Sequence, residues 1–108
     1  MHKRYLTIIK NNKGMAEYDT GVEESNNIAV CELPESEFED LCNYDVFKKL
    51  NEECNLMIDD YESEVIDRRA LDKANKFLLD DEFFKNTSVF KKAFESACNE
   101  GVALALDF

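Results

Sequence analysis

The feature that most constrains the fold is an apolar run near the C-terminus, from Val102 to Leu106. Such a run is typical of a strand that is buried on both faces of its sheet. It follows Gly101, which is expected to end a helix whose inward positions run from Val89 to Cys98 at three- and four-residue spacing. A helix, a glycine and an apolar strand in close succession predict that the strand packs against the helix before it.

The first 58 residues predict further strands. Tyr5 to Asn11 alternates and is rich in β-forming residues, and the turn residues that follow lead into a plausible return strand from Met15 to Thr20. Together these two segments predict an N-terminal hairpin. A third strand is expected from Asn27 to Leu33, and a brief buried strand from Leu56 to Ile58.

Helices are expected between and after these strands. Pro34 is compatible with a helix start, and apolar residues then recur on one helical face as far as Cys54. Asp45 could split this segment into two helices by capping the second. Asp67 can cap a further helix, and Thr87 or Ser88 can cap the last one.

The fold class that follows is α+β. We expect one domain spanning residues 1–108, with a mixed or mostly antiparallel sheet of four or five strands, an N-terminal hairpin and three or four covering helices. The hydrophobic fraction of 44%, with only three Gly and one Pro, argues for a packed core rather than disorder. No apolar run approaches the roughly 18–20 residues that span a bilayer, so no membrane association is expected.

Cysteine and histidine usage disfavours metal, redox and nucleophilic chemistry. The four cysteines have no Cys-x-x-Cys spacing, and the single histidine is His2, at a terminus. Free thiols suit a reducing cytoplasm. The three glycines stand apart, unlike a phosphate-binding loop. We therefore expect no cofactor, no metal and no catalytic residues, although paired carboxylates acting as acid and base stay an alternative.

Charge is distributed unevenly along the chain, whose net charge is −11. Residues 1–16 carry four basic and no acidic side chains, residues 17–67 carry seventeen acidic and two basic ones, and residues 68–108 carry seven of each. This field disfavours direct binding to nucleic acid, whose phosphates need Lys and Arg. It favours a basic protein partner and can accelerate association with one.

The residues expected to contact such a partner lie in two acidic segments. The segment 59–64 lacks the alternating ligands and the central glycine of an EF-hand loop, so calcium is disfavoured. It is either a solvated loop or a binding epitope in which carboxylates surround a tyrosine anchor. The second segment begins a helix, where its carboxylates also favour the helix dipole. The predicted partner-binding residues are Asp59, Asp60, Tyr61, Glu62, Glu64, Glu39 and Asp40.

In its length, strong acidity, β-rich start, acidic central helices and closing helix-Gly-strand from Phe94 to Leu106, the chain resembles a class of bacterial proteins. These are the small immunity proteins encoded beside polymorphic or contact-dependent growth-inhibition toxins. The resemblance implies a non-catalytic cytoplasmic inhibitor that binds its cognate toxin tightly. Many such toxins are nucleases with basic clefts that acidic immunity proteins cover. Two alternatives stay open, an intracellular adaptor or regulatory subunit and a phage-encoded nucleic-acid mimic.

Overall fold

The computed structural model describes residues 3–22, 24–60, 62–78 and 88–108. These residues form four strands and five helices, in the order β1 (Arg4–Ile9), α1 (Asn12–Asp19), β2 (Ile28–Leu33), α2 (Glu35–Asn43), α3 (Val46–Cys54), β3 (Ser63–Asp67), α4 (Arg68–Leu78), α6 (Val89–Glu100) and β4 (Ala103–Asp107). The α+β class predicted from the sequence is confirmed, with one more helix than expected.

The four strands form one antiparallel sheet in the order β2-β1-β4-β3. The last strand of the chain therefore lies in the interior of the sheet, between the first strand and β3. Its residues Ala103 to Leu106 are all fully buried, as the apolar run predicted. The run has to be apolar on both sides because Leu104 and Leu106 join one hydrophobic cluster and Ala103 and Ala105 join another.

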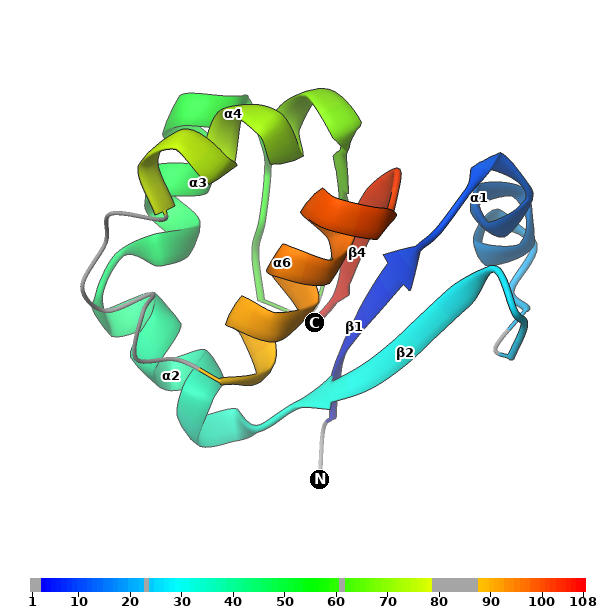
Figure 1. The fold of residues 1–108 in the computed structure, drawn as a ribbon. Helices are drawn as coiled ribbons and strands as arrows, with labels where there is room; N and C mark the ends of the chain where they lie inside the picture. Colours follow the sequence, from blue (N-terminus) through cyan, green and yellow to red (C-terminus); the bar gives the residue numbers. More distant parts are fainter. Residues whose placement is uncertain (1–2, 23, 61, 79–87) are drawn as a thin grey trace.

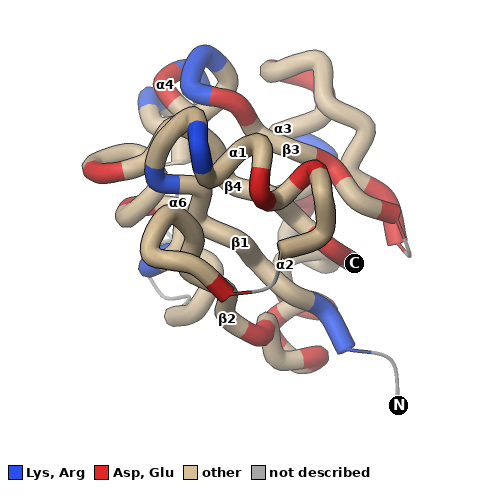
Figure 2. The backbone as a smooth tube through the Cα atoms, turned by 90° about the vertical axis from the view of Figure 1, so that its right-hand side faces the viewer, with Lys and Arg blue, Asp and Glu red and all other residues tan. Residues whose placement is uncertain are grey.

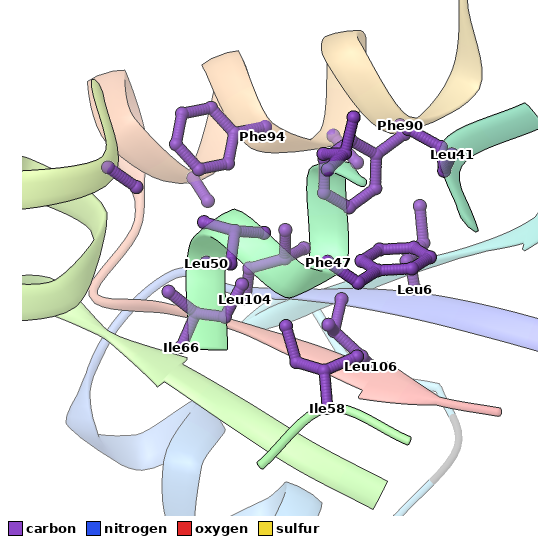
Figure 3. Packing of buried hydrophobic residues seen from close by; sticks show 14 of the residues in the cluster. Leu6, Leu41, Phe47, Leu50, Ile58, Ile66, Phe90, Phe94, Leu104 and Leu106 are labelled. Carbon is purple, nitrogen blue, oxygen red and sulfur yellow. The ribbon is translucent and has the colours of Figure 1, made fainter. Parts of the chain in front are cut away.

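The two faces of the sheet are covered unequally. Helices α2, α3, α4 and α6 lie over one face, and the short helix α1 lies on the other (Figure 1). The main core fills the space under the four helices (Figure 3). Phe47 is central to it, with its ring centroid 5.7 Å from that of Phe38, 5.7 Å from that of Phe90 and 5.2 Å from that of Phe108. Edge and tilted contacts of this kind add about 0.5–1.5 kcal/mol per pair beyond the burial of area.

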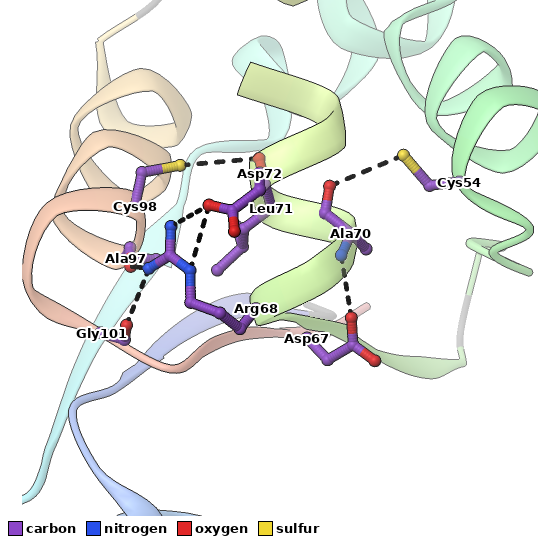
Figure 4. Close-up of polar contacts among 9 residues, drawn as sticks. All are labelled: Cys54, Asp67, Arg68, Ala70, Leu71, Asp72, Ala97, Cys98 and Gly101. Carbon is purple, nitrogen blue, oxygen red and sulfur yellow. Dashed lines mark hydrogen bonds and ion pairs between the residues drawn. The ribbon is translucent and has the colours of Figure 1, made fainter. Parts of the chain in front are cut away.

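Polar side chains fix the ends of the helices in the main layer. The Asp67 carboxylate accepts a hydrogen bond from the Ala70 N–H at 2.9 Å, so the predicted cap of α4 is confirmed. Arg68 donates to the carbonyls of Ala97 and Gly101 at 3.2 and 3.0 Å (Figure 4). A cation at the negative C-terminal end of α6 is favourable, so this contact joins α4 to α6.

The predicted return strand from Met15 to Thr20 is wrong, because most of this segment belongs to helix α1. Asn11 adopts an extended conformation, and its side chain accepts a hydrogen bond from the Gly14 N–H at 2.8 Å, which is a helix N-cap. Gly14 is buried so close to β2 that a Cβ there would lie 2.3 Å from the Asn27 carbonyl oxygen. The residues that resemble a hairpin turn are thus a capping residue and a close-packing glycine. The N-terminal pair of adjacent strands is β1 and β2, joined through α1.

The predicted strand from Leu56 to Ile58 is also absent, and these residues form no regular element. The Asn51 side chain donates to the Ile58 carbonyl at 3.0 Å and accepts from the Ile58 N–H at 2.7 Å. Both backbone groups of Ile58 are thereby satisfied without a neighbouring strand, which lets this residue be buried in a loop. The strand instead begins at Ser63, inside the segment expected to be an acidic loop.

The predicted division of the first long helical segment is confirmed, since α2 ends at Asn43 and α3 begins at Val46. Asp45 does not cap α3 through its side chain, because its backbone is left-handed, with φ of 60°. None of the described helices is both long enough and apolar enough to cross a membrane.

Candidate partner-binding surface

Carboxylates from several elements lie at one end of the sheet. Residue pairing places Tyr5 beside both Glu32 and Asp107, and Asp107 beside Ser63, so the ends of four strands meet there. Helix α2 starts at this end, two residues after β2. We call this surface the acidic end, made of Glu32, Glu35, Glu39, Asp59, Asp60, Glu62 and Asp107.

The buried side chain of Arg4 binds two carboxylates of the acidic end, Glu35 and Asp60. Its side chain is 5% exposed, and it donates from Nε to Glu35 at 2.9 Å and from Nη1 to Asp60. Its guanidinium carbon also lies 3.6 Å from the centroid of the Phe38 ring, a cation–π arrangement. The two carboxylates raise the pKa of Arg4, with the Glu35 hydrogen bond as the largest cause, so it stays charged although buried. One cation thus fixes the start of β1, the first turn of α2 and the 59–60 loop.

Cys42 lies close enough to three of these carboxylates, Asp60, Glu35 and Glu39, for their charges to act on its thiol. Its pKa is raised, first by partial desolvation of this exposed residue and next by the charge of Asp60. Arg4 acts in the opposite direction, and Glu35 and Glu39 add smaller contributions. Glu35, Glu39 and Cys42 follow one another at the four- and three-residue spacing of one helix face. The start of α2 and residues 59–60 therefore lie side by side, joined by the bonds from Arg4 to Glu35 and Asp60.

Several carboxylates on this surface are available to a partner. Within the described residues, Glu39 and Glu62 of the acidic end are exposed, as is the predicted Asp40 beside Glu39 on α2. The side chains of these three accept no hydrogen bond and join no ion pair. Glu32 lies 3.5 Å from Lys3, but both side chains are at least half exposed and such pairs contribute about 0–1 kcal/mol. A basic partner could replace this lysine at little cost.

The predicted site residues have different places in the structure. Asp59 and Asp60 lie together, and the Asp59 carboxylate accepts the Asp60 N–H at 2.8 Å. Glu64 is half-buried in β3, where its carboxylate accepts the Met57 N–H at 2.7 Å, so it serves the fold. Tyr61, expected to be the aromatic anchor, lies outside the described residues.

Some residues at this end were not among the predicted partner-binding residues, although the acidic surface was expected within residues 32–67 and so includes Glu32 and Glu35. Glu32 and Asp107 lie on strands whose neighbours only the sheet order reveals. Glu35 was interpreted through the helix dipole, and its first-turn position supports that, but it also holds Arg4. No spacing rule connects Arg4 with partners 31 and 56 residues away.

Basic side chains lie mostly elsewhere. Lys10 and Lys13 are close to the opposite end of β1, where α1 begins, and Arg68 and Lys73 belong to α4. Figure 2 shows most of the basic segments on the side of α1, α4 and α6, and acidic segments around the C-terminus. Apart from Lys3 and Arg4, which pair with carboxylates of the acidic end, the described basic side chains thus lie away from it.

The described residues offer little for metal chemistry. No three His, Cys, Asp or Glu side chains among them are placed to hold a metal ion. The four cysteines are unpaired thiols, and burial raises the pKa of each of them. Thiols with raised pKa values are poor nucleophiles at neutral pH.

Comparison with protein families, curated proteins and solved structures finds no match to this chain. What the surface can do therefore follows from its chemistry. Exposed carboxylates on a fixed framework can pair with Lys and Arg side chains and attract a positively charged protein over a distance.

Proposed function

We propose that this protein is a non-catalytic, stoichiometric inhibitor, an immunity protein that binds and neutralises a cognate bacterial toxin through its acidic end. The observation that carries the proposal is the convergence of carboxylates from β2, α2, residues 59, 60 and 62, and β4 on a framework tied by buried Arg4. The resemblance to small immunity proteins supports the assignment to this class.

The arrangement suits inhibition because the framework is fixed before the partner arrives. Arg4 holds Glu35 and Asp60 in place, so these two carboxylates lose little freedom on binding. The exposed carboxylates beside it, such as Glu39 and Glu62, raise the local negative potential and steer a basic protein toward the surface. A nuclease cleft, which is basic because it binds phosphates, has the complementary charge.

The proposed location is the cytoplasm, where an immunity protein meets an incoming or newly made toxin. The free thiols agree with a reducing compartment. Fractionation of the native host with an epitope-tagged chain tests this location, and recovery in the periplasmic or extracellular fraction would contradict it.

The proposed function is tested by capture of the partner from the native host. Tagged wild-type protein, an Asp59→Lys/Glu62→Lys variant and a Glu52→Lys/Glu53→Lys variant are used as baits at low and at high salt. Both variants change the net charge from −11 to −7. Glu52 and Glu53 lie in the last turn of α3, beside Cys54, whose thiol contacts the start of α4 at Ala70, at the end of β3 opposite Ser63. Wild type and the α3 variant should capture one basic toxin domain at a 1:1 ratio, and the acidic-end variant should lose it.

Co-expression then measures neutralisation directly. The captured domain should stop growth when expressed alone and be harmless beside the wild-type chain. A partner that is acidic or non-toxic, or one that both variants capture equally, would refute the proposal and favour an adaptor whose acidity serves solubility.

A further inference from the structure

The face of the sheet opposite the main helical layer contains a groove of about 760 Å³. It exists because α1 covers this face only near one end of the strands, packing Met15 and Tyr18 against it. The groove is lined by residues of three strands, of α1 and of the chain after α1, namely Tyr5, Thr7, Ile28, Val30, Asp107, Tyr18, Gly21, Val22, Glu24 and Ser25. Its walls are therefore partly aromatic and aliphatic.

The apolar part of the groove is accessible. Tyr5 is 38% exposed, Val30 is 47% exposed, and Val22, on the wall formed by the segment after α1, is 39% exposed. These three are among the five large hydrophobic side chains that are exposed in the described residues. Their gathering in one hollow is typical of a contact site rather than of scattered surface apolar residues.

A carboxylate is fixed in the wall of this groove. Oδ1 of Asp107 accepts hydrogen bonds from the Tyr18 hydroxyl at 2.8 Å and from the Ser63 hydroxyl at 2.7 Å. In the described structure Oδ2 of Asp107 accepts none, so one oxygen sets the orientation of the group and the other is open to a ligand. Burial and the bond to Asp107 raise the pKa of Tyr18, so its hydroxyl stays a donor at neutral pH.

The charge around the groove selects a cation. Glu24 lies on its wall with Asp107, and Glu32 pairs with Tyr5 on the adjacent strand. No Lys or Arg is among the described residues that line it. An apolar segment would leave Glu24 and the second oxygen of Asp107 without water or a partner. A second copy of a chain with net charge −11 would be repelled. Tyr5 and Tyr18 add ring faces that attract an ammonium or guanidinium group.

We propose that the groove receives a Lys or Arg side chain from a segment of the basic protein partner, with Asp107 as the carboxylate that binds its charged group. The aliphatic stem of that side chain packs on Tyr5 and Val30, and its head reaches Asp107 Oδ2. This inference rests on the proposed function for the nature of the partner. It adds a specific contact, next to the acidic end and continuous with it through Asp107.

The test uses the whole chain and a peptide probe, so it does not depend on finding the toxin. An amide-shift NMR titration is run with Ac-Gly-Arg-Gly-Arg-Gly-NH2 and with the same peptide carrying citrulline, which is neutral and nearly isosteric with arginine. The arginine peptide should shift the amide signals of Tyr5, Thr7, Val30 and Asp107. The citrulline peptide should bind about tenfold more weakly, the size expected from losing one charged contact.

Two variants with the same change of charge locate the contact. Asp107→Asn retains an oxygen that can accept from Tyr18 and Ser63, so the fold should persist, which an otherwise unchanged amide spectrum would verify. It should weaken the arginine peptide about tenfold. Asp59→Asn, at the acidic end but outside the groove, should change the affinity less than about twofold, because distant exposed charges are screened.

Each contrary result overturns the inference. Shifts confined to α2 and residue 59, or equal weakening by the two variants, would show general attraction to the acidic end and leave the proposed function intact. No shifts at millimolar peptide would remove the groove as a cation site. Failure of the proposed function itself would appear separately, in the capture experiment with the lysine variants.

Discussion

At the residue scale, Arg4 connects the fold to the surface. A buried guanidinium is unfavourable unless its charge and its donors are paired, and here two carboxylates and a ring face supply the partners. Although they bind Arg4, the side chains of Glu35 and Asp60 are still 51% and 46% exposed, so each can also reach a partner. Arg4 therefore stabilises the molecule and holds its proposed binding surface at the same time.

Substitution of Arg4 should destabilise the protein more when the new side chain keeps fewer of its interactions. Arg4→Lys keeps the charge but loses the two-sided hydrogen bonding, and should lower the free energy of unfolding by about 1 kcal/mol. Arg4→Ala also loses the packing on Phe38 and should lower it by about 2–4 kcal/mol. Urea unfolding followed by circular dichroism measures both. Equal stability of Arg4→Ala and wild type would contradict this role.

Cys42 provides a sensor of the local potential. Because burial and the charge of Asp60 raise its pKa, its thiolate fraction at pH 8 should be below that of an ordinary thiol, whose pKa is about 8.5. Its alkylation rate should therefore rise only at higher pH, and Asp60→Asn should move this rise to lower pH. Site-resolved mass spectrometry after timed iodoacetamide treatment measures the rate. A profile like that of free cysteine would show that the acidic end does not extend to this position.

Contacts between residues that are close along the chain could be predicted from the sequence, and contacts between residues far apart along it could not. Asp67 was identified as a helix cap because the cap and the N–H it accepts from are three residues apart. The partners of Arg4 depend on the fold, as does the pairing of Tyr18 with Asp107 across 89 residues. Sequence reasoning therefore found an acidic surface without finding the cation that organises it.

At the scale of elements, Glu37 replaces the expected cap of α6. Ser88 occupies the N-cap position but makes no side-chain cap bond. Instead the Glu37 carboxylate of α2 accepts from the Ser88 hydroxyl at 3.0 Å and from the Phe90 N–H at 2.7 Å. Thr87, the other predicted cap, lies outside the described residues. The negative charge also suits the positive end of the helix dipole.

Removal of this carboxylate should weaken the attachment of α6 to α2. Glu37→Ala leaves several N–H groups at the start of α6 without an acceptor and should cost about 1–2 kcal/mol of unfolding free energy. The matched control is Glu39→Ala, two residues along the same helix, whose exposed side chain has no described partner and should change stability by less than about 0.5 kcal/mol. Chemical unfolding of both variants provides the comparison, and equal effects would refute the cap.

Two elements were predicted wrongly, and in both a side chain makes the backbone hydrogen bonds that a neighbouring strand would otherwise make. Asn11 begins a helix where turn residues suggested a hairpin, and Asn51 satisfies Ile58 where apolar residues suggested a strand. Strand β4 was placed correctly because a strand buried on both faces leaves a long apolar run. β3 was obscured by its exposed acidic residues, since it lies at the edge of the sheet.

At the scale of the whole molecule, charge polarity is the property that bears on the proposed function. The fold places Lys10 and Lys13 close to one end of β1, and places Glu32, Glu35 and Asp60 near the other. The net charge of −11 is therefore directed, and it can orient a basic partner as well as attract it. Directed charge of this kind acts chiefly on the rate of association.

The most direct measurement of the central claim is the rate of association with the captured partner as a function of ionic strength, by stopped-flow fluorescence. The wild-type rate should fall steeply with salt, and Asp59→Lys/Glu62→Lys should lower the low-salt rate by about 10–100-fold and flatten that dependence. The Glu52→Lys/Glu53→Lys variant, with the same net charge, should stay close to wild type. Equal effects of the two variants would mean that total charge, and not the acidic end, governs binding.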